Sequence, residues 1–183
     1  MTMASPPETP LLNGNSIEIH VYSIGALSGG AAGAVATVIA PGMVTIPGTL
    51  LSATFGDRSI TISEAVPASC FSFLASDLSA GEGLLFNGLR FTTAATTPAI
   101  GEVAVNVNAT TIGGFEVWFG PHDVFVDLRG LTLACGDDIS LDLCCLSADS
   151  PEVALLPERS VGTRSVTNSP IRQSRFGVTR REF

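Results

Sequence analysis

The sequence contains no lysine, and charged residues make up only 14% of its 183 residues. A typical globular domain is about one quarter charged, so the surface of this protein must consist mainly of small polar and apolar side chains. Such a surface favours contact with other proteins, because fewer ions have to be desolvated on association. The nine cations are all arginine, the side chain best suited to planar, bidentate contacts that become buried.

Groups that carry out chemistry are also scarce, since only two His, one Trp and one Tyr are present. No phosphate-binding loop, dinucleotide fingerprint or Cys-x-x-Cys zinc pair occurs. His122 beside Asp123 could belong to a hydrolytic triad, but no serine stands in a nucleophile elbow. Asp137, Asp138 and Asp142 lack the alternating ligands and closing Glu of a calcium loop. We therefore expect a protein that is not an enzyme and that uses no cofactor or metal.

The four cysteines are expected to be reduced thiols in the core. The N-terminus has neither the basic start nor the apolar centre of a signal peptide, so we expect synthesis in a cytoplasm, where thiols stay reduced. A disulfide from Cys135 to Cys144 or Cys145 is the alternative in an oxidising compartment. Because Cys144 and Cys145 are adjacent, strand geometry places them on opposite faces of a sheet. The remaining cysteine is Cys70.

Residues 22–56 carry no charge, which raises the question of a membrane segment. Three glycines at four-residue spacing between positions 25 and 33 resemble the close-packing face of a membrane helix. However, the segment is rich in Gly, Ala, Ser and Thr, Pro41 and Pro47 interrupt it, and no basic residue flanks it. We expect no membrane span here, but a Gly-rich loop followed by short buried strands.

Most of the remaining chain alternates apolar and polar residues, as in half-buried β-strands. Hairpin turns are expected at Asn87-Gly88 and at Gly113-Gly114, and one helical turn within residues 75–85. The expected strands span residues 16–24, 34–39, 43–46, 49–55, 59–63, 69–74, 84–93, 102–111, 115–119, 123–133 and 139–146. This pattern predicts an all-β domain over residues 15–150, an antiparallel β-sandwich resembling a jelly roll, with a closed β-barrel as the alternative.

Both ends are predicted to be extended arms, residues 1–14 and residues 151–183, because their apolar residues are too sparse to offset the entropy of ordering. Residues 1–158 hold three Arg and sixteen acids, a net charge of −13, whereas residues 159–183 hold six Arg and one acid, a net charge of +5. An acidic body and a basic arm suit docking of the arm on a neighbouring copy. The residues predicted to bind a partner are Arg159, Arg164, Arg172, Arg175, Phe176, Arg180, Arg181 and Phe183.

These features predict a structural homo-oligomer that contacts copies of itself and another capsid protein. We expect a viral capsid, capsid-surface or decoration protein, made in the host cytoplasm and located in the virion. Nucleic acid is disfavoured as a partner, because the arm has few aromatics and the body would repel phosphates. The alternative is a β-sandwich binding or adhesion module for a glycan or host protein, which an exposed Trp118 in a concave site would support. A hydrolase would need a pocket containing His122 or the Asp137 group.

Overall fold

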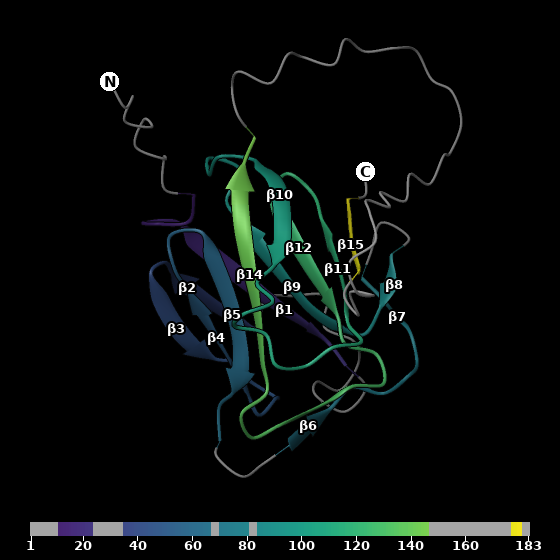
Figure 1. Ribbon diagram of the computed structural model, residues 1–183. Helices are drawn as coiled ribbons and strands as arrows, with labels where there is room; N and C mark the ends of the chain where they lie inside the picture. Colours follow the sequence, from purple (N-terminus) through teal and green to yellow (C-terminus); the bar gives the residue numbers. More distant parts are fainter. Residues whose placement is uncertain (1–10, 24–34, 67–69, 81–83, 147–176, 181–183) are drawn as a thin grey trace, which may run out of the picture.

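The computed structural model describes residues 11–23, 35–66, 70–80 and 84–146, together with the backbone of residues 177–180. Within these ranges every regular element is a β-strand, and the strands form two stacked sheets (Figure 1). The prediction of an all-β fold built from antiparallel sheets is confirmed among these residues, apart from one parallel strand pair, and the two layers are compatible with the predicted sandwich. In the part of the chain that the structure describes neither sheet closes into a barrel, so the barrel alternative is wrong. The jelly roll stays a prediction.

The larger sheet has six strands in the order β15-β11-β12-β9-β1-β2. Its strands are β1 (Ser16–Tyr22), β2 (Ala36–Ile39), β9 (Gly88–Thr93), β11 (Glu116–Phe119), β12 (Asp123–Asp127) and β15 (Gly177–Arg180). The smaller sheet has five strands in the order β10-β14-β5-β4-β3. Its strands are β3 (Gly42–Thr45), β4 (Leu51–Phe55), β5 (Ser59–Glu64), β10 (Ile100–Val105) and β14 (Asp138–Cys145).

Two short ribbons complete the described structure: β6 (Cys70–Ser72) pairs with β13 (Thr132–Ala134), and β7 (Leu78–Ser79) pairs with β8 (Leu85–Phe86). The β7–β8 ribbon lies on the side of the six-stranded sheet that faces away from the five-stranded sheet (Figure 1). The helical turn expected within residues 75–85 is not formed in the described residues of that range, 75–80 and 84–85. The side chains of Leu84 and Phe86, with Leu78 packed beside them, instead form a second apolar cluster with side chains of the six-stranded sheet.

The core lies between the two sheets and follows the predicted alternation. In β1 the side chains of Ile17, Ile19 and Val21 are at most 1% exposed, whereas Glu18 between them is exposed. Phe55 of one sheet and Phe91 of the other pack edge to face, with 5.6 Å between their ring centroids. Burial of one such side chain stabilises the fold by about 1.5–3 kcal/mol, so the facing rows of apolar residues hold the layers together.

The body begins earlier in the chain than the predicted boundary at residue 15. Leu11 and Leu12 are both fully buried in the core, and their amides donate hydrogen bonds to the carbonyl of Asp57 at 3.3 and 2.9 Å. Residues 1–10 of the predicted N-terminal arm lie outside the described residues. The two leucines directly follow a segment rich in polar and proline residues, which hid their role as core residues.

Both predicted hairpins are wrong. Between β8 and β9, Asn87 is fully buried, and its side-chain amide donates to the carbonyls of Leu74 (2.9 Å) and Ser76 (3.1 Å). Asn87 therefore holds the point where the chain passes from the β7–β8 ribbon into the six-stranded sheet, because β8 pairs with β7 whereas β9 pairs with β1 and β12. Likewise, Gly113 and Gly114 connect β10 in one sheet to β11 in the other. In both places the dipeptide is typical of a hairpin turn, but the strands on its two sides pair with other strands.

The described part of the uncharged segment contains strands β2, β3 and β4, which are joined by short turns. No helix among the described residues is long and apolar enough to cross a membrane.

Candidate assembly interface

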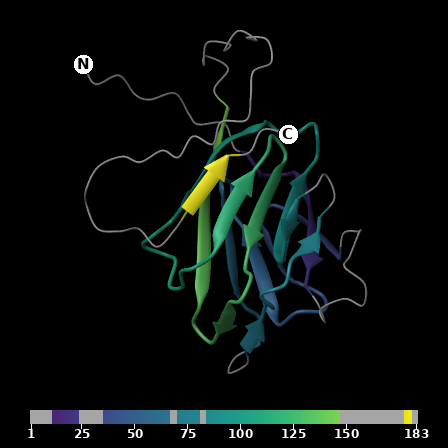
Figure 2. The same ribbon diagram turned by 90° about the vertical axis from the view of Figure 1, so that its right-hand side faces the viewer.

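The C-terminal strand β15 lies on the edge of the six-stranded sheet beside β11 (Figure 2). Among the described strands, its pairing with β11 is the one parallel pairing, with the register Glu116↔Gly177, Val117↔Val178, Trp118↔Thr179 and Phe119↔Arg180. Four residues of the predicted C-terminal arm therefore occupy a defined position on the body. Such an edge strand contributes through its backbone, because an open strand edge presents a row of unpaired N–H and C=O groups.

Of the eight residues predicted to bind a partner, only Arg180 lies in the described part of the chain, and there only its backbone is described, in β15. The other seven lie outside the described residues: Arg159, Arg164, Arg172, Arg175, Phe176, Arg181 and Phe183. No strand was predicted within residues 151–183. The four residues Gly-Val-Thr-Arg offer too short a pattern, and their partner strand is about sixty positions earlier.

A second apolar cluster supports the strand that receives β15. On the outer face of the six-stranded sheet, Phe86 packs against Tyr22 (4.9 Å between ring centroids), Phe125 (5.6 Å) and Trp118 (6.2 Å). Trp118 belongs to β11 and is only 3% exposed. The β7–β8 ribbon therefore fixes β11 from outside, while Val117 fixes it from the core. Because Trp118 is buried, it does not provide the exposed aromatic surface that would have supported the alternative of a glycan- or protein-binding module.

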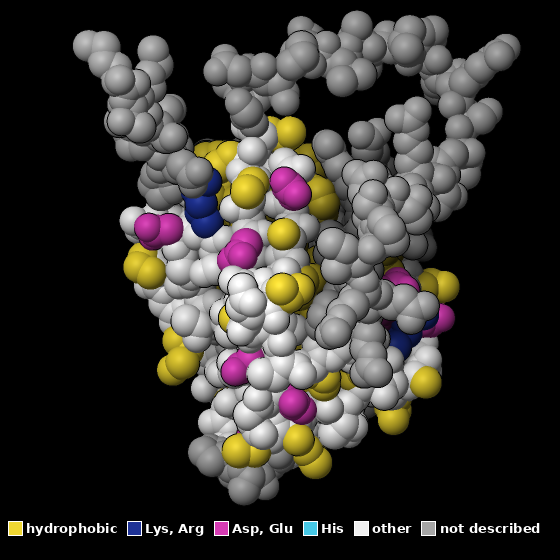
Figure 3. Space-filling model, in the orientation of Figure 1, with side chains coloured by type: hydrophobic (Ala, Val, Ile, Leu, Met, Phe, Trp, Pro, Cys, Tyr) yellow, Lys and Arg dark blue, Asp and Glu magenta, His cyan; other side chains and the backbone are white. Residues whose placement is uncertain are grey.

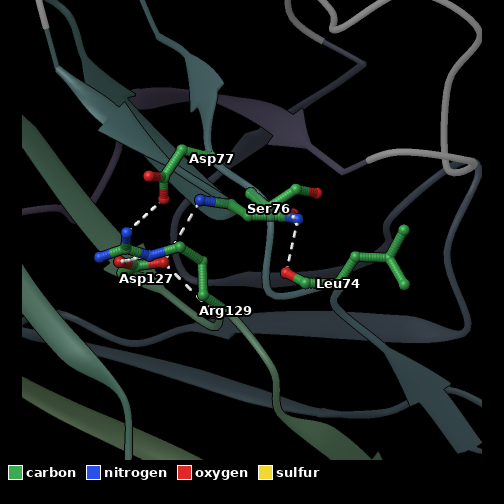
Figure 4. A network of polar contacts seen from close by, with 6 residues as sticks. Leu74, Ser76, Asp77, Asp127 and Arg129 are labelled. Atoms are coloured by element: carbon green, nitrogen blue, oxygen red, sulfur yellow. Dashed lines mark hydrogen bonds and ion pairs between the residues drawn. The ribbon is translucent and has the colours of Figure 1, made fainter.

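Beside this cluster, Arg129 joins two carboxylates (Figure 4). Its Nε donates to Asp127 Oδ2 at 2.6 Å, and one terminal nitrogen donates to Asp77. Asp127 is 3% exposed, and its other oxygen accepts backbone N–H bonds from Asn87 (3.3 Å) and Arg129 (3.2 Å). Burial lowers the pKa of the Arg129 guanidinium, but its hydrogen bonds to Asp77 and Asp127 raise the pKa above its ordinary value. The buried carboxylate is thus fully compensated.

Arg90 forms a second charged contact on the same outer face. Its Nε donates to Asp123 Oδ1 at 2.9 Å, and its guanidinium lies 5.1 Å from the centroid of the Phe125 ring. Burial alone would lower the pKa of Arg90, but the hydrogen bond and charge of Asp123 raise it above the ordinary value. The same carboxylate oxygen accepts a bond from Thr92 Oγ1 at 2.7 Å. Asp123 is therefore occupied by Arg90 and Thr92, and the structure gives no support for a triad built on His122 and Asp123.

A small, open pocket of about 270 Å³ lies next to the arginine network. It is lined by Ala75, Gly114, Glu116, Asp127 and Arg129, and neither His122 nor the Asp137 group enters it. Asp137 instead closes a turn by accepting the Ala134 N–H at 2.8 Å. Among the residues that the structure describes, no three His, Cys, Asp or Glu side chains come together as a metal site.

The outer face of the five-stranded sheet is rich in hydroxyl and carboxylate groups. On β5 and β14, Thr61 and Ser140 face each other with their oxygens 3.3 Å apart, and Glu102 of β10 and Asp142 of β14 are exposed nearby in the ladder. Figure 3 shows acidic side chains scattered over this face, with Arg only at its margins. This face is flat and negatively charged, and is suited to a basic partner.

The sandwich side opposite to β15 carries exposed apolar residues. Strands β2 and β3 are the last strands of the two sheets on that side. Ile39 of β2 is 65% exposed and Met43 of β3 is 68% exposed. Edge strands with exposed apolar side chains are sites where another chain can add, so this edge is a second candidate for contact between copies.

None of the four cysteines forms a disulfide, but the prediction that they lie in the core is wrong. Cys70, Cys135 and Cys144 are exposed, and Cys145 is half-buried against the core. Cys144 and Cys145 do take opposite faces of β14, as strand alternation requires. The outward position of Cys144 follows from register, because Leu143 and Leu141 fill the core side of the strand.

No family model, curated protein or solved structure matches this chain. Its function has to be inferred from the strand edge, the charge distribution and the exposed surfaces.

Proposed function

We propose that this protein is a structural subunit that assembles with copies of itself, as a viral capsid, capsid-surface or decoration protein, through its C-terminal arm. The observation that carries the proposal is the pairing of β15 with β11. A segment of the basic arm adds a strand to the body through main-chain groups, a recurring mode of recognition between chains. Such an arm extends an interface without enlarging the fold. Location in a virion, synthesis in a host cytoplasm and contact with another capsid protein are parts of the same proposal.

The charge distribution supports docking between copies. Residues 1–158 have a net charge of −13 and residues 159–183 a net charge of +5. Arg90 and Arg129 are already paired with aspartates of the body, so they leave the exposed carboxylates such as Glu102 and Asp142 for an external cation. Complementary charges steer encounter and select the correct partner.

The surface of the body supports contact with protein as well. Exposed apolar side chains on β2 and β3 and a hydroxyl-rich sheet face can be covered at a low cost of ion desolvation. The jelly roll is part of this proposal, and the two stacked sheets support it. A comparison of the strand connections with those of known jelly-roll proteins would test it.

Sedimentation velocity and negative-stain electron microscopy of the full chain, over a wide range of concentrations, test the proposal. We expect a defined oligomer or particle that forms at high concentration. A chain that remains monomeric throughout would contradict self-assembly. Uniform closed particles would favour a shell-forming subunit, whereas small oligomers that bind to a preformed capsid would favour a decoration subunit.

A further inference from the structure

We propose that the β11 edge is a strand-acceptor site that is filled by β15 of a second copy, so that copies are linked by exchange of their C-terminal strands. This inference rests on the proposed function and adds the site, the strand and the register to it. The partner is a second copy of this chain, and the residues that it supplies are Gly177–Arg180, in the register Glu116↔Gly177 through Phe119↔Arg180.

The first reason is the kind of contact that β15 makes. Only four residues pair, in parallel and with one neighbouring strand, whereas β1 pairs with strands on both sides, through four residue pairs with β2 and six with β9. Residues 147–176, thirty positions, separate β15 from the preceding strand. The entropic cost of bringing two segments of one chain together rises only slowly with the number of residues between them, so thirty intervening positions do not decide whether β15 pairs within one chain or between two. Exchange of an identical element between copies then costs little.

The second reason is the preparation of the acceptor. Val117 is fully buried on the core side of β11, and Trp118 is 3% exposed against Phe86 on the other side. Both faces of the strand are therefore held by the body, independently of the strand that covers its edge. A rigid edge strand is an aggregation hazard unless it is covered, and a strand from a neighbouring copy covers it while linking the two subunits.

The third reason is charge complementarity. Glu116 is exposed at the start of β11, whereas the other carboxylate of the adjoining pocket, Asp127, is already paired with Arg129. The segment that arrives in this place belongs to the basic arm, which holds six arginines against one acid. Each subunit offers one acidic acceptor edge and one basic donor strand. Such a head-to-tail contact closes into rings, or continues into larger assemblies, according to its rotation.

Disulfide trapping between two different chains tests the exchange. One full-length chain carries Glu116→Cys, and a second full-length chain, with a tag of different size, carries Gly177→Cys. Neighbouring strands lie about 4.8 Å apart, within the Cα separation of about 4.4–6.8 Å that a disulfide spans. In both chains the four native cysteines are replaced, the three exposed ones by Ser and Cys145 by Ala. The two chains are mixed, refolded together and oxidised.

Because each chain has one thiol, a disulfide between the two tags forms only when the strand of one copy lies on the edge of the other. We expect this mixed disulfide to be the main product. A wrong-register control pairs Glu116→Cys with Arg180→Cys, whose positions are three residues apart along the strands, about 10 Å, and we expect its yield to be lower by at least about tenfold.

A chain that carries both Glu116→Cys and Gly177→Cys supplies the converse test. A monomer with an internal disulfide, together with no mixed disulfide from the two single variants, would show that β15 closes on its own chain and would overturn the exchange. Absence of any cross-link in this chain would overturn the pairing itself. If the double variant closes internally and light scattering still finds an oligomer, the proposed function stands without the exchange. If no cross-link forms at all, the pairing that carries the proposed function is lost with the exchange, and a full chain that is a monomer contradicts both.

Discussion

Gly88 occupies a position in β9 where the neighbouring strand leaves no room for a side chain. A Cβ atom at this position would lie 2.0 Å from the backbone oxygen of Val126 and 3.1 Å from the nitrogen of Leu128. These are backbone atoms of the strand that pairs with β9 and of the residue after it, so no side-chain rotation can relieve the contact. The glycine therefore allows the central ladder of the six-stranded sheet to close.

Gly88→Ala is expected to destabilise the protein by about 3 kcal/mol or more, because the backbones of two central strands must separate. The free energy of unfolding from urea titration measures this cost. The matched control is Gly14→Ala, since a Cβ at Gly14 meets nothing within 4 Å and only the positive φ of 77° opposes it. That strain costs about 1 kcal/mol. Equal losses in the two variants would contradict the close approach at Gly88.

The network around Arg129 makes a second prediction for single residues. Arg129→Met removes the cation from Asp127, whose carboxylate is 3% exposed. We expect it to lower the free energy of unfolding by about 2 kcal/mol. This loss is smaller than that for breaking a fully buried ion pair, because Arg129 itself is partly exposed. Asp77→Asn affects the exposed end of the network and should cost less than about 1 kcal/mol. Denaturant titration of both variants compares them, and a larger loss for Asp77→Asn would show that Asp127 does not depend on Arg129.

At the scale of elements, the ribbon β7–β8 stabilises the outer face of β11. Phe86 is fully buried and packs against three aromatic rings. Phe86→Ala is expected to cost about 3–5 kcal/mol and to shift the emission of Trp118 to longer wavelength, as water reaches the indole. The protein has a single tryptophan, so the emission reports this cluster alone.

Leu85→Ala is the control for Phe86→Ala, because the adjacent Leu85 is 54% exposed and its truncation should change stability by no more than about 0.5 kcal/mol. An unchanged Trp118 emission in Phe86→Ala would show that the ribbon does not cover the indole.

The exposed edge of β2 and β3 makes a prediction about association. The double variant Ile39→Lys with Met43→Lys places charges on two exposed positions, where the fold should lose little stability. Charged residues on edge strands oppose pairing with other chains. If this edge joins copies, the variant should form smaller species in sedimentation velocity, with unchanged melting temperature. An unchanged size distribution would exclude the edge as a contact surface.

Element positions were largely predictable, because alternation along β1 or β14 records which side chains face the core. The strands with which they pair were not predictable in the same way. Gly113-Gly114 has the chemistry of a hairpin, yet β10 and β11 lie in different sheets, since strand pairing depends on apolar surfaces distant in sequence. Asn87 was read as a turn residue, although burial and two hydrogen bonds to carbonyls make it an anchor.

The candidate interface was predictable only in outline. The charge difference between body and arm is visible in the sequence, but β15 has four residues and pairs with a strand about sixty positions earlier. A short parallel strand leaves no periodic signal. Trp118 was considered as an exposed binding residue, and its burial depends on Phe86 and Phe125 from other elements.

For the whole molecule, three features combine: an acidic two-layer body, an acceptor edge on one side with exposed apolar residues on the other, and a basic C-terminal arm. If arm docking depends on charge, raising the salt concentration should weaken assembly, because the Debye length falls from about 10 Å at 0.1 M to about 3 Å at 1 M. Light scattering across this salt range measures the effect, and assembly that is insensitive to salt would point to backbone and apolar contacts instead.

The most direct test of the central claim is the mass in solution, by light scattering, of the full chain beside a chain that ends at Glu158. We predict that the full chain forms a defined oligomer or larger particle and that the shortened chain, which lacks β15 and six of the nine arginines, falls to a smaller species while remaining folded. Two chains of the same oligomeric state, whether both monomers or both full assemblies, would contradict the role of the arm.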